Sequence, residues 1–295
     1  MPEARTLVFG ATGSLGRHVL NELVARGTAP ETITTVGRDA TRLAELAEAG
    51  FGTAALDLSD AAGVADLVSH HCKAHPGIHS DIVLISGSDP DRLAQHLSVT
   101  EAAKNADAPH VYYTSGVRAD DQSEINADHK ATEDALTASG ITYTILRNTW
   151  YIENYLQAMA RARHTGVLAA AVGNAVVAAA SRKDLAQALA PVVTTNGHDN
   201  VTYSLSGDTD FTYADIAEAM SVALAHDVTY LPVSPHELRA QLTGAGMDEG
   251  LAGFLASLDE TIATGTFSRV GDDLSRLIGR PTTGLVEGLT EGHAP

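Results

Sequence analysis

Three glycines near the start of the chain follow one another at three-residue intervals. Gly10, Gly13 and Gly16 lie directly after an apolar run, Thr6–Phe9, and directly before an amphipathic helical pattern. A strand that turns through glycines into a helix leaves free backbone amides at the helix start, where they can bind phosphate. The motif therefore predicts a parallel α/β sheet with a dinucleotide site. Because the spacing differs from the usual G-x-G-x-x-G, the alternative is a glycine-rich turn without a ligand.

The following residues alternate between short β-rich runs and longer amphipathic stretches. We expect strands at 6–10, 32–36, 52–56, 81–85, 111–114 and 142–146, and helices at 15–26, 41–49, 61–69, 93–105 and 127–139. This alternation is typical of βαβ units, so it predicts a Rossmann-like, doubly wound parallel sheet in an α/β fold. Ligands bind such sheets beyond the carboxyl ends of the strands, so we expect the site in the loops that follow them.

After residue 150 the pattern loosens and becomes mostly helical. Helices are expected at 152–163, 213–225, 235–245 and 249–264, and short strands at 176–180, 201–206 and 228–231. Ser181–Asp184 and Ser234–Glu237 have the S-x-x-D/E spacing of capping boxes. We therefore predict a cofactor-binding core over residues 1–150. Residues 151–295 would form a small C-terminal lobe on the substrate side, interleaved with the core rather than independent.

The composition excludes several kinds of partner. The 295 residues carry a net charge of −18, which argues against binding to nucleic acid or to anionic membranes. Cys72 is the only cysteine, so no intrachain disulfide can form and a reducing compartment is indicated. No apolar run approaches the length of a membrane span. We expect a cytoplasmic protein, and a homodimer is consistent with this class.

Arg38 follows the second expected strand and bears on the choice of cofactor. At this position a carboxylate would accept from the ribose hydroxyls of NADH, whereas an arginine would bind the 2′-phosphate of NADPH. Arg38 therefore favours NADPH, with NADH as a weaker alternative. Asp39 is adjacent and keeps NADH open as a cofactor. The other alternative is that Arg38 is a solvated turn residue with no ligand.

Two later loops complete the expected cofactor site. Asp57 and Leu58 follow the third strand, where a carboxylate can accept from the adenine amine, although Asp57 would serve equally well as a helix N-cap. The fourth strand ends at Ile85 and is followed by Ser86-Gly87-Ser88, which are small and polar where a ribose and a nicotinamide would pass.

The segment Leu146-Arg-Asn-Thr-Trp-Tyr-Ile-Glu-Asn-Tyr155 leaves the sixth expected strand. With the glycine loop, Val36-Gly-Arg38, Tyr113-Thr-Ser115 and Thr132-Glu133, it resembles the NmrA-like branch of the atypical short-chain dehydrogenases/reductases, and within it the type 2 NAD(P)H:quinone oxidoreductases. The resemblance implies hydride transfer from NADPH to a quinone or a similar small conjugated acceptor. The cofactor contacts it implies fall on Gly10, Thr12, Gly13, Ser14, Leu15, Gly16, Arg38, Ile85, Ser86, Gly87, Ser88, Arg147, Asn148 and Thr149.

One departure from ordinary short-chain dehydrogenases bears on the chemistry. Those enzymes use a serine with Tyr-x-x-x-Lys, and this chain contains no Tyr-x-x-x-Lys. Ser115 keeps its expected place, whereas Ile125 and His129 occupy the Tyr and Lys positions. We take Ser115 and His129 as the catalytic candidates, with an exposed helical histidine as the alternative for His129. A quinone needs an acid less than a ketone does, because hydride addition leaves a stable phenolate. A non-catalytic, NADP(H)-binding redox-sensing regulator fits the same departure.

Trp150, Tyr151 and Tyr155 are concentrated in a chain that is only 5% aromatic. They could stack on a planar acceptor and are our substrate-binding candidates, but they could equally seal the start of the lobe. Tyr113, by contrast, is expected to pack between the sheet and a helix.

A rival cluster, His70-His-Cys-Lys-Ala-His75-Pro-Gly-Ile-His79, carries residue types that bind zinc or nickel. It lies between an expected helix and the next strand, at the end of the sheet opposite the cofactor loops. We interpret it as a surface insertion and predict no physiological metal site.

Overall fold

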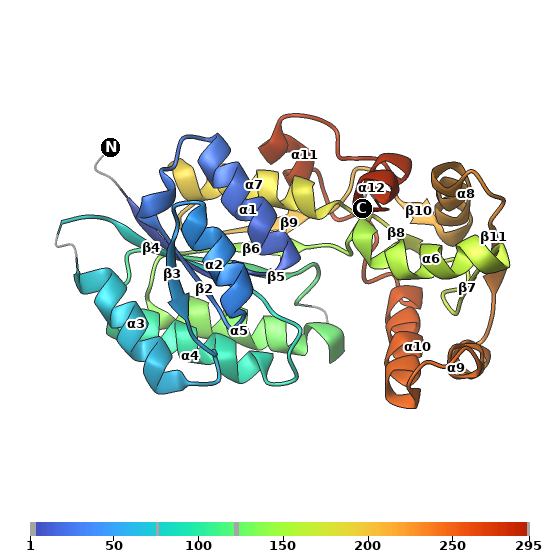
Figure 1. The fold of residues 1–295 in the computed structure, drawn as a ribbon, viewed down its shortest axis with the longest axis horizontal. Coiled ribbons are helices and arrows are strands. Elements are labelled where there is room, and N and C mark those ends of the chain that lie inside the picture. The colour runs from blue at the N-terminus through green and yellow to red at the C-terminus, as the bar shows by residue number, and fades with distance from the viewer. Residues whose placement is uncertain (1–3, 75–76, 121–123, 294–295) are drawn as a thin grey trace. The chain divides into compact units, whose positions relative to one another are not determined.

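The computed structural model describes residues 4–74, 77–120 and 124–293 (Figure 1). The chain forms two compact units. The first contains the described residues of 1–122, 126–148 and 185–203, and the second contains those of 123–125, 149–184 and 204–295.

The first unit is built on a seven-stranded sheet with the order β3-β2-β1-β4-β5-β6-β9, and the ladders from β3 to β6 are parallel. Its elements are β1 (Arg5–Phe9), α1 (Ser14–Ala25), η1 (Pro30–Thr32), β2 (Ile33–Gly37), α2 (Ala40–Glu48), β3 (Gly52–Ala55), α3 (Ala61–Lys73), β4 (Ser80–Ile85), α4 (Arg92–Asn105), β5 (Val111–Gly116), α5 (Ala127–Ser139) and β6 (Tyr143–Asn148), together with most of α7 (Arg182–Thr194) and β9 (Val201–Leu205). The short helix η2 (Glu124–Asn126) is divided between the two units. The predicted Rossmann-like sheet is confirmed. Its strand order reverses between β1 and β4, which is where such sheets bind ligands.

Helices cover both faces of this sheet. Figure 1 shows α3, α4 and α5 along one face and α1 and α7 along the other. The central strand β4 is buried at every position, whereas the edge strand β3 alternates between half-buried and exposed residues. Leu7, Phe9, Leu84 and Tyr113 are fully buried in the core between the sheet and α3, α4 and α5. Burial of each such side chain stabilises the fold by roughly 1.5–3 kcal/mol, which fixes the positions of the loops at the carboxyl edge.

The second unit is mostly helical and contains two small sheets, in which β8 pairs with β10 and β7 pairs with β11. Its elements are η3 (Ile152–Tyr155), α6 (Leu156–Thr165), β7 (Val167–Ala170), β8 (Val176–Val177), β10 (Phe211–Thr212), α8 (Tyr213–Leu224), β11 (Thr229–Pro232), α9 (Pro235–Gly244), α10 (Glu249–Ala263), α11 (Asp273–Ile278) and α12 (Leu285–His293). Leu238 and Leu242 of α9 pack on Ala252 and Ala256 of α10. The expected strand at 176–180 is shorter than predicted, and β7, β10, α11 and α12 are additional.

The two expected capping boxes differ. Ser234 and Glu237 form both reciprocal hydrogen bonds at the start of α9. Ser181 accepts from the amide of Asp184, but the Asp184 carboxylate binds Arg280 and Thr283 instead of returning to the cap. Asp184 is fully buried, and its carboxylate binds the C-terminal segment at Arg280 and Thr283 instead of capping the start of α7.

The histidine-rich segment is exposed over most of its described residues, but one of its histidines is buried. Helix α3 continues to Lys73, and His71 on it is buried, with Nε2 3.1 Å from the carbonyl oxygen of Asp81. His75 lies outside the described residues. Within 4–74, 77–120 and 124–293, no three histidine, cysteine or acidic side chains gather closely enough to hold a metal ion. Nor does this part of the chain contain a helix with the length and apolar character needed to cross a membrane.

Candidate active site

The loop between β1 and α1 depends on its glycines. Gly10 has a φ of +77°, and a Cβ on it would lie 2.8 Å from the carbonyl oxygen of Ile85 on β4. A Cβ on Gly16 would run into the carbonyl of Gly10 and lie 2.7 Å from the Cα of Ala11. The loop therefore packs directly on β4 and on the first turn of α1, and larger residues would displace it.

The start of α1 is open to an anion. Gly13 is the N-cap, and among the described residues no side chain caps the helix. The amides of Ser14, Leu15 and Gly16 stand in the first turn, where a helix provides no carbonyl partners. The first turn carries no acidic residue, so the positive end of the helix dipole is not neutralised. This arrangement fits the pyrophosphate of a dinucleotide.

Arg38 lies just beyond the carboxyl end of β2, and its side chain is 59% exposed. Its guanidinium is 3.0 Å from Asp89 and 3.8 Å from Asp57. Asp39 is used differently, because its carboxylate caps α2 by accepting from the amides of Thr41 and Arg42. The carboxylate that would favour NADH is thus occupied, whereas the arginine is accessible.

Arg42 is a second cation at this edge that sequence reasoning missed. Its Nη1 donates to the carbonyl oxygen of Thr12 in the glycine loop at 3.1 Å, and its Nε is 3.4 Å from Asp39. The only sequence signal is its position one helical turn after Arg38. Arg42 therefore ties the β2–α2 connection to the glycine loop.

Asp57 is not the helix N-cap that we considered as its alternative. Asp60 caps α3 by accepting from the amide of Gly63. Asp57 instead accepts from the amide of Ser59 at 2.9 Å, and this bond, with Arg38 nearby, holds the pKa of its carboxyl below the usual range. Leu58 is half-buried against the core. Asp57 therefore remains available beside the expected adenine position.

The loop after β4 begins with an anchored residue and then becomes open. The amide of Ser86 donates to Thr114 Oγ1 of β5 at 2.9 Å, which joins the ends of the two strands. Gly87 and Ser88 are exposed. This loop starts at Ile85, whose carbonyl faces Gly10, so the two predicted cofactor loops lie side by side.

Glu133 on α5 unites two of the predicted site residues. It accepts from Nε and Nη2 of Arg147 at 2.9 and 2.7 Å, and from the hydroxyl of Ser115 at 2.6 Å. Asp120 Oδ2 lies 3.1 Å from Nη1 of the same arginine. The hydrogen bond with Glu133 raises the pKa of Arg147 above its usual value. Thr132-Glu133 lies in a stretch of the family resemblance, but no role follows from its sequence alone.

This network bears on the roles expected of Ser115 and Arg147, which remain predictions. The Ser115 hydroxyl directs its hydrogen to Glu133, so it does not offer that hydrogen to a substrate oxygen. The Arg147 guanidinium is held by two carboxylates rather than being free for the cofactor. Both residues lie at the carboxyl ends of adjacent strands, where Ser115 pairs in register with Arg147.

His129 lies one element away, on α5. Its Nδ1 is 2.8 Å from the hydroxyl of Tyr113, which is fully buried between the sheet and the helices, as the sequence predicts. Burial, with Arg92 and His96 nearby, lowers the pKa of His129 to about 3. His129 is therefore neutral near pH 7 and is not the exposed histidine of our alternative. It cannot deliver a proton as an imidazolium.

Asn148 ends β6 in the first unit, and its carbonyl oxygen accepts from the amide of Val117 at 2.9 Å. The candidates that follow it belong to the second unit. Thr149 is buried and donates to the carbonyl oxygen of Ala178 at 3.0 Å. The Trp150 ring packs on Phe267 with a centroid distance of 5.1 Å. The Arg182 guanidinium lies 4.5 Å above the ring of Tyr151, so one face of that ring is covered. These contacts stabilise the unit from within.

Tyr155 is a core residue rather than a stacking surface. It is 4% exposed and packs edge-on against Tyr213, with ring centroids 5.8 Å apart. Burial raises its pKa well above the usual value. The sealing role that we considered as the alternative is therefore the one that the structure shows for Tyr155.

Asp259 of α10, also in the second unit, should make the free energy of unfolding depend on pH. Its Oδ2 accepts from the amide of Ala171 at 2.7 Å, and burial raises the pKa of this carboxyl to about 6. The unfolded chain loses the same proton near pH 4, so the free energy of unfolding should fall by about 3 kcal/mol as the pH rises through about 4 to 6.

Asp259→Asn should remove this decline, because a neutral amide needs no proton. We expect parent-like stability at about pH 4 and a gain of about 3 kcal/mol at about pH 8, measured by urea unfolding. Glu260→Gln, which alters the exposed neighbour on the same helix, is the matched control and should keep the parent profile. An asparagine variant with the parent slope would contradict the assignment.

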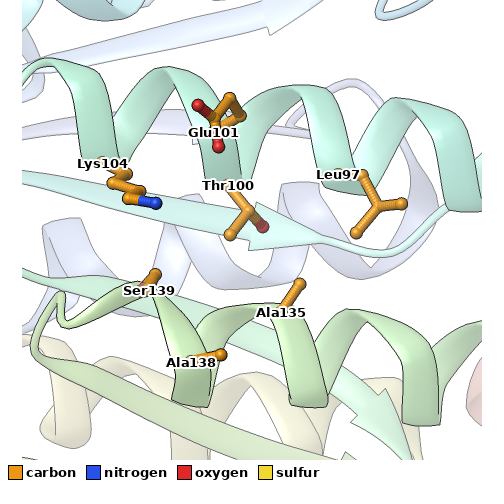
Figure 2. Close-up of a pocket in the computed structure, with 7 residues that line it drawn as sticks. All are labelled: Leu97, Thr100, Glu101, Lys104, Ala135, Ala138 and Ser139. Atoms are coloured by element: carbon orange, nitrogen blue, oxygen red, sulfur yellow. The ribbon is translucent and has the colours of Figure 1, made fainter.

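A cavity of about 260 Å³ lies between α4 and α5, away from these loops. Figure 2 shows the residues that line it: Leu97, Thr100, Glu101 and Lys104 from α4, and Ala135, Ala138 and Ser139 from α5. Lys104 and Ser139 lie at the C-terminal ends of their helices. Since these helices run back toward the amino ends of the strands, this end of the cavity lies far from the carboxyl edge.

Comparison with known proteins settles the family. Residues 10–196 match the NAD(P)H-binding family. The chain is 34% identical over 284 residues to Quinone oxidoreductase 2 of Escherichia coli, covering 96% of each protein. The chain belongs to the NAD(P)H-binding family. The resemblance to NmrA-like reductases, which the sequence motifs indicate, is thereby confirmed.

Solved structures of two reductases have the same fold as this NAD(P)H-binding protein. The NADPH complex of the Escherichia coli quinone oxidoreductase superposes with a TM-score of 0.88, over 97% of this chain and 99% of that one. The Citrobacter sp. triphenylmethane reductase has a TM-score of 0.89 at 28% identity, over 98% of this chain and 99% of that one.

Proposed function

We propose that this protein is an NADPH-dependent oxidoreductase that transfers a hydride to a quinone or a similar small conjugated acceptor. The observation that carries the proposal is the pairing of an accessible Arg38 with the uncapped amides of the glycine loop at one edge of the sheet. An arginine beside an anion-binding helix start matches the 2′-phosphate and the pyrophosphate of NADPH. The quinone oxidoreductase relative, at 34% identity, supports the acceptor class.

We assign the residues to two halves of the cofactor. Gly10, Thr12, Gly13, Ser14, Leu15 and Gly16 would hold the pyrophosphate, Arg38 the 2′-phosphate, and Asp57 and Leu58 the adenine. Ile85, Ser86, Gly87, Ser88, Asn148 and Thr149 would line the nicotinamide half. Trp150 and Tyr151 remain our substrate-side proposals. The division into a core over 1–150 and a lobe over 151–295, a cytoplasmic location and a homodimer likewise remain proposals.

Reduction of a quinone by hydride transfer needs little acid catalysis from the protein. Bound NADPH supplies a hydride, which with the quinone and one proton gives the hydroquinone. The phenolate formed by hydride addition is stabilised by its ring, so water can provide that proton. This agrees with the absence of Tyr-x-x-x-Lys from the sequence and with a neutral His129. The protein's contribution is to bind, orient and shield the reacting groups.

Loss of NADPH absorbance in the presence of benzoquinone- and menadione-type acceptors tests the proposal. We expect saturable turnover that requires both NADPH and the acceptor. A panel that includes an azo dye and a triphenylmethane dye would define the acceptor range. Tight NADPH binding without turnover on any acceptor would refute the enzyme and favour the alternative, a redox-sensing regulator that only binds NADP(H).

Arg38→Ala should raise the Kd for NADPH about thirtyfold and leave the Kd for NADH nearly unchanged. The variant loses charge-assisted hydrogen bonds to a phosphate, which are worth roughly 2 kcal/mol, while Asp57 and Asp89 remain to repel it. Fluorescence titration with each cofactor measures the two constants. Arg26→Ala, an exposed arginine at the other end of α1, is the control for a simple loss of charge. Equal losses for both cofactors would exclude a 2′-phosphate role.

A further inference from the structure

A chain of buried polar groups runs beneath the carboxyl edge of the first unit. The Tyr113 hydroxyl lies 2.8 Å from His129 Nδ1 and 3.3 Å from His96 Nδ1. His96 Nδ1 is also 3.2 Å from Thr132 Oγ1, whose hydroxyl donates to the carbonyl oxygen of Asp128 at 2.7 Å. Tyr113, His96 and Thr132 are at most 1% exposed, so each hydrogen must find its acceptor inside this chain.

The direction of these hydrogen bonds follows from the one group that can only accept. The Asp128 carbonyl takes the hydrogen of the Thr132 hydroxyl, so the Thr132 oxygen accepts from His96 Nδ1. His96 therefore carries its hydrogen on Nδ1. Its Nε2 is buried and has no hydrogen-bond partner among the described residues. This agrees with an unprotonated Nε2, because a buried N–H without an acceptor would be costly.

The same reasoning fixes the next link. The Tyr113 hydroxyl has His96 Nδ1, Thr132 and His129 Nδ1 around it. The His96 nitrogen carries a hydrogen and the Thr132 oxygen accepts from it, so we assign the Tyr113 hydrogen to His129 Nδ1, which lies 2.8 Å from the hydroxyl. Burial raises the pKa of Tyr113 well above its usual value, which keeps the hydroxyl protonated. With Nδ1 occupied as an acceptor, the single hydrogen of the neutral His129 ring must be on Nε2.

The Cδ2–Nε2 edge of the His129 ring lies beside the end of β5. Its Cδ2, the ring atom next to Nε2, lies 3.1 Å from where a Cβ on Gly116 would stand. Gly116 ends β5 directly after Ser115, at the edge of the sheet that carries the cofactor loops. The glycine leaves space for the ring, and the ring edge that bears the hydrogen lies next to the end of the strand.

We propose that Tyr113 and His96 are positioning residues that hold His129 as the uncharged Nε2–H tautomer, a fixed hydrogen-bond donor to an oxygen at the active site. This inference rests on the proposed function for its role in turnover. The oxygen acceptor is either a hydroxyl of the nicotinamide ribose or the carbonyl of the conjugated substrate. His129 thereby supplies a donor where the ordinary enzymes place a lysine, but without a positive charge.

The tautomer can be read directly, without any ligand. A long-range proton–nitrogen correlation spectrum of the protein with labelled histidine distinguishes Nε2–H from Nδ1–H, and His129→Gln identifies the His129 signals. We expect one Nε2–H form in the parent and in Tyr112→Phe, the matched control on the same strand. Tyr113→Phe, which removes only the hydroxyl, should give a mixture of tautomers. Thr132→Val tests the same chain from its other end and should also produce a mixture.

The Kd for NADPH and the kcat of His129 variants then show which oxygen accepts the hydrogen bond, the ribose hydroxyl or the substrate carbonyl. His129→Leu should raise the Kd for NADPH about tenfold if the oxygen is on the ribose, or lower kcat about tenfold at unchanged Kd if it is on the acceptor. His129→Gln keeps a donor near the Nε2 position and should retain most of the function. An Nδ1–H parent, a tautomer that Tyr113→Phe and Thr132→Val leave unchanged, or a His129→Leu variant with parental Kd and kcat would each overturn the proposal. If the parent reduces no quinone, the spectrum and the NADPH affinity still decide it.

Discussion

Replacing Gly16 with alanine should raise the Kd for NADPH at least about 100-fold and lower the free energy of unfolding by about 2 kcal/mol. The added Cβ would meet the carbonyl of Gly10 and would lie 2.7 Å from the Cα of Ala11. Both neighbours are backbone atoms, so no side-chain rotation can relieve the overlap. The loop itself must move away from α1, and the amides that we assign to the pyrophosphate move with it.

Gly253→Ala is the matched control for this variant, because Gly253 is also a helical glycine. It lies inside α10, and a Cβ there would meet nothing within 4 Å. Alanine should therefore stabilise this helix by about 0.5–1 kcal/mol and leave NADPH binding unchanged. Calorimetric titration and urea unfolding of both variants provide the comparison. A Gly16→Ala protein that binds NADPH like the parent would show that the glycine loop does not hold the phosphates.

The fold of the first unit could be predicted from the sequence because each strand and helix has a local hydrophobic pattern. Each strand of the sheet from β1 to β6 is a short apolar or β-branched run next to a helical pattern, and the strand order follows from the rules of βαβ connection. The exceptions have physical causes. The strand at 176–180 lies in the second unit, whose short pairings depend on distant segments. Helix α3 extends through His70 and Cys72 because His71 is buried against β4, which no hydrophobic pattern reveals.

Local sequence signals also predicted where the loops of the candidate site lie. They did not predict which side chains in the site hydrogen-bond to one another. Gly10, Arg38 and Ser86 follow strands, so their positions at the carboxyl edge came from topology alone. Glu133 joins residues from two strands, and Tyr113 joins two histidines from different helices. Such pairings depend on the register of packed elements, which sequence spacing does not encode. Likewise, aromatic content did not show that Tyr155 is buried.

Glu133→Gln should be the most destabilising polar substitution in the first unit, at about 3 kcal/mol. The Glu133 side chain is 6% exposed and that of Arg147 is 16% exposed, so the pair is largely removed from water. Glutamine leaves the guanidinium without its main counter-charge and cannot accept two parallel N–H bonds with both of its terminal atoms. Ser115 also loses a charged acceptor. We expect a lower midpoint in urea at an unchanged slope, because the unfolded state is the same.

A second pair on the same helix separates this effect from a general loss of charge. Lys130 and Asp134 form an ion pair at 2.5 Å, but both side chains are more than 40% exposed. Asp134→Asn should therefore cost less than about 1 kcal/mol. Arg147→Met combined with Glu133→Leu should be less destabilising than the sum of the single changes, because neither charge is then left alone. If Glu133→Gln costs no more than Asp134→Asn, the network of Glu133 with Ser115 and Arg147 does not hold the carboxyl ends of β5 and β6 together.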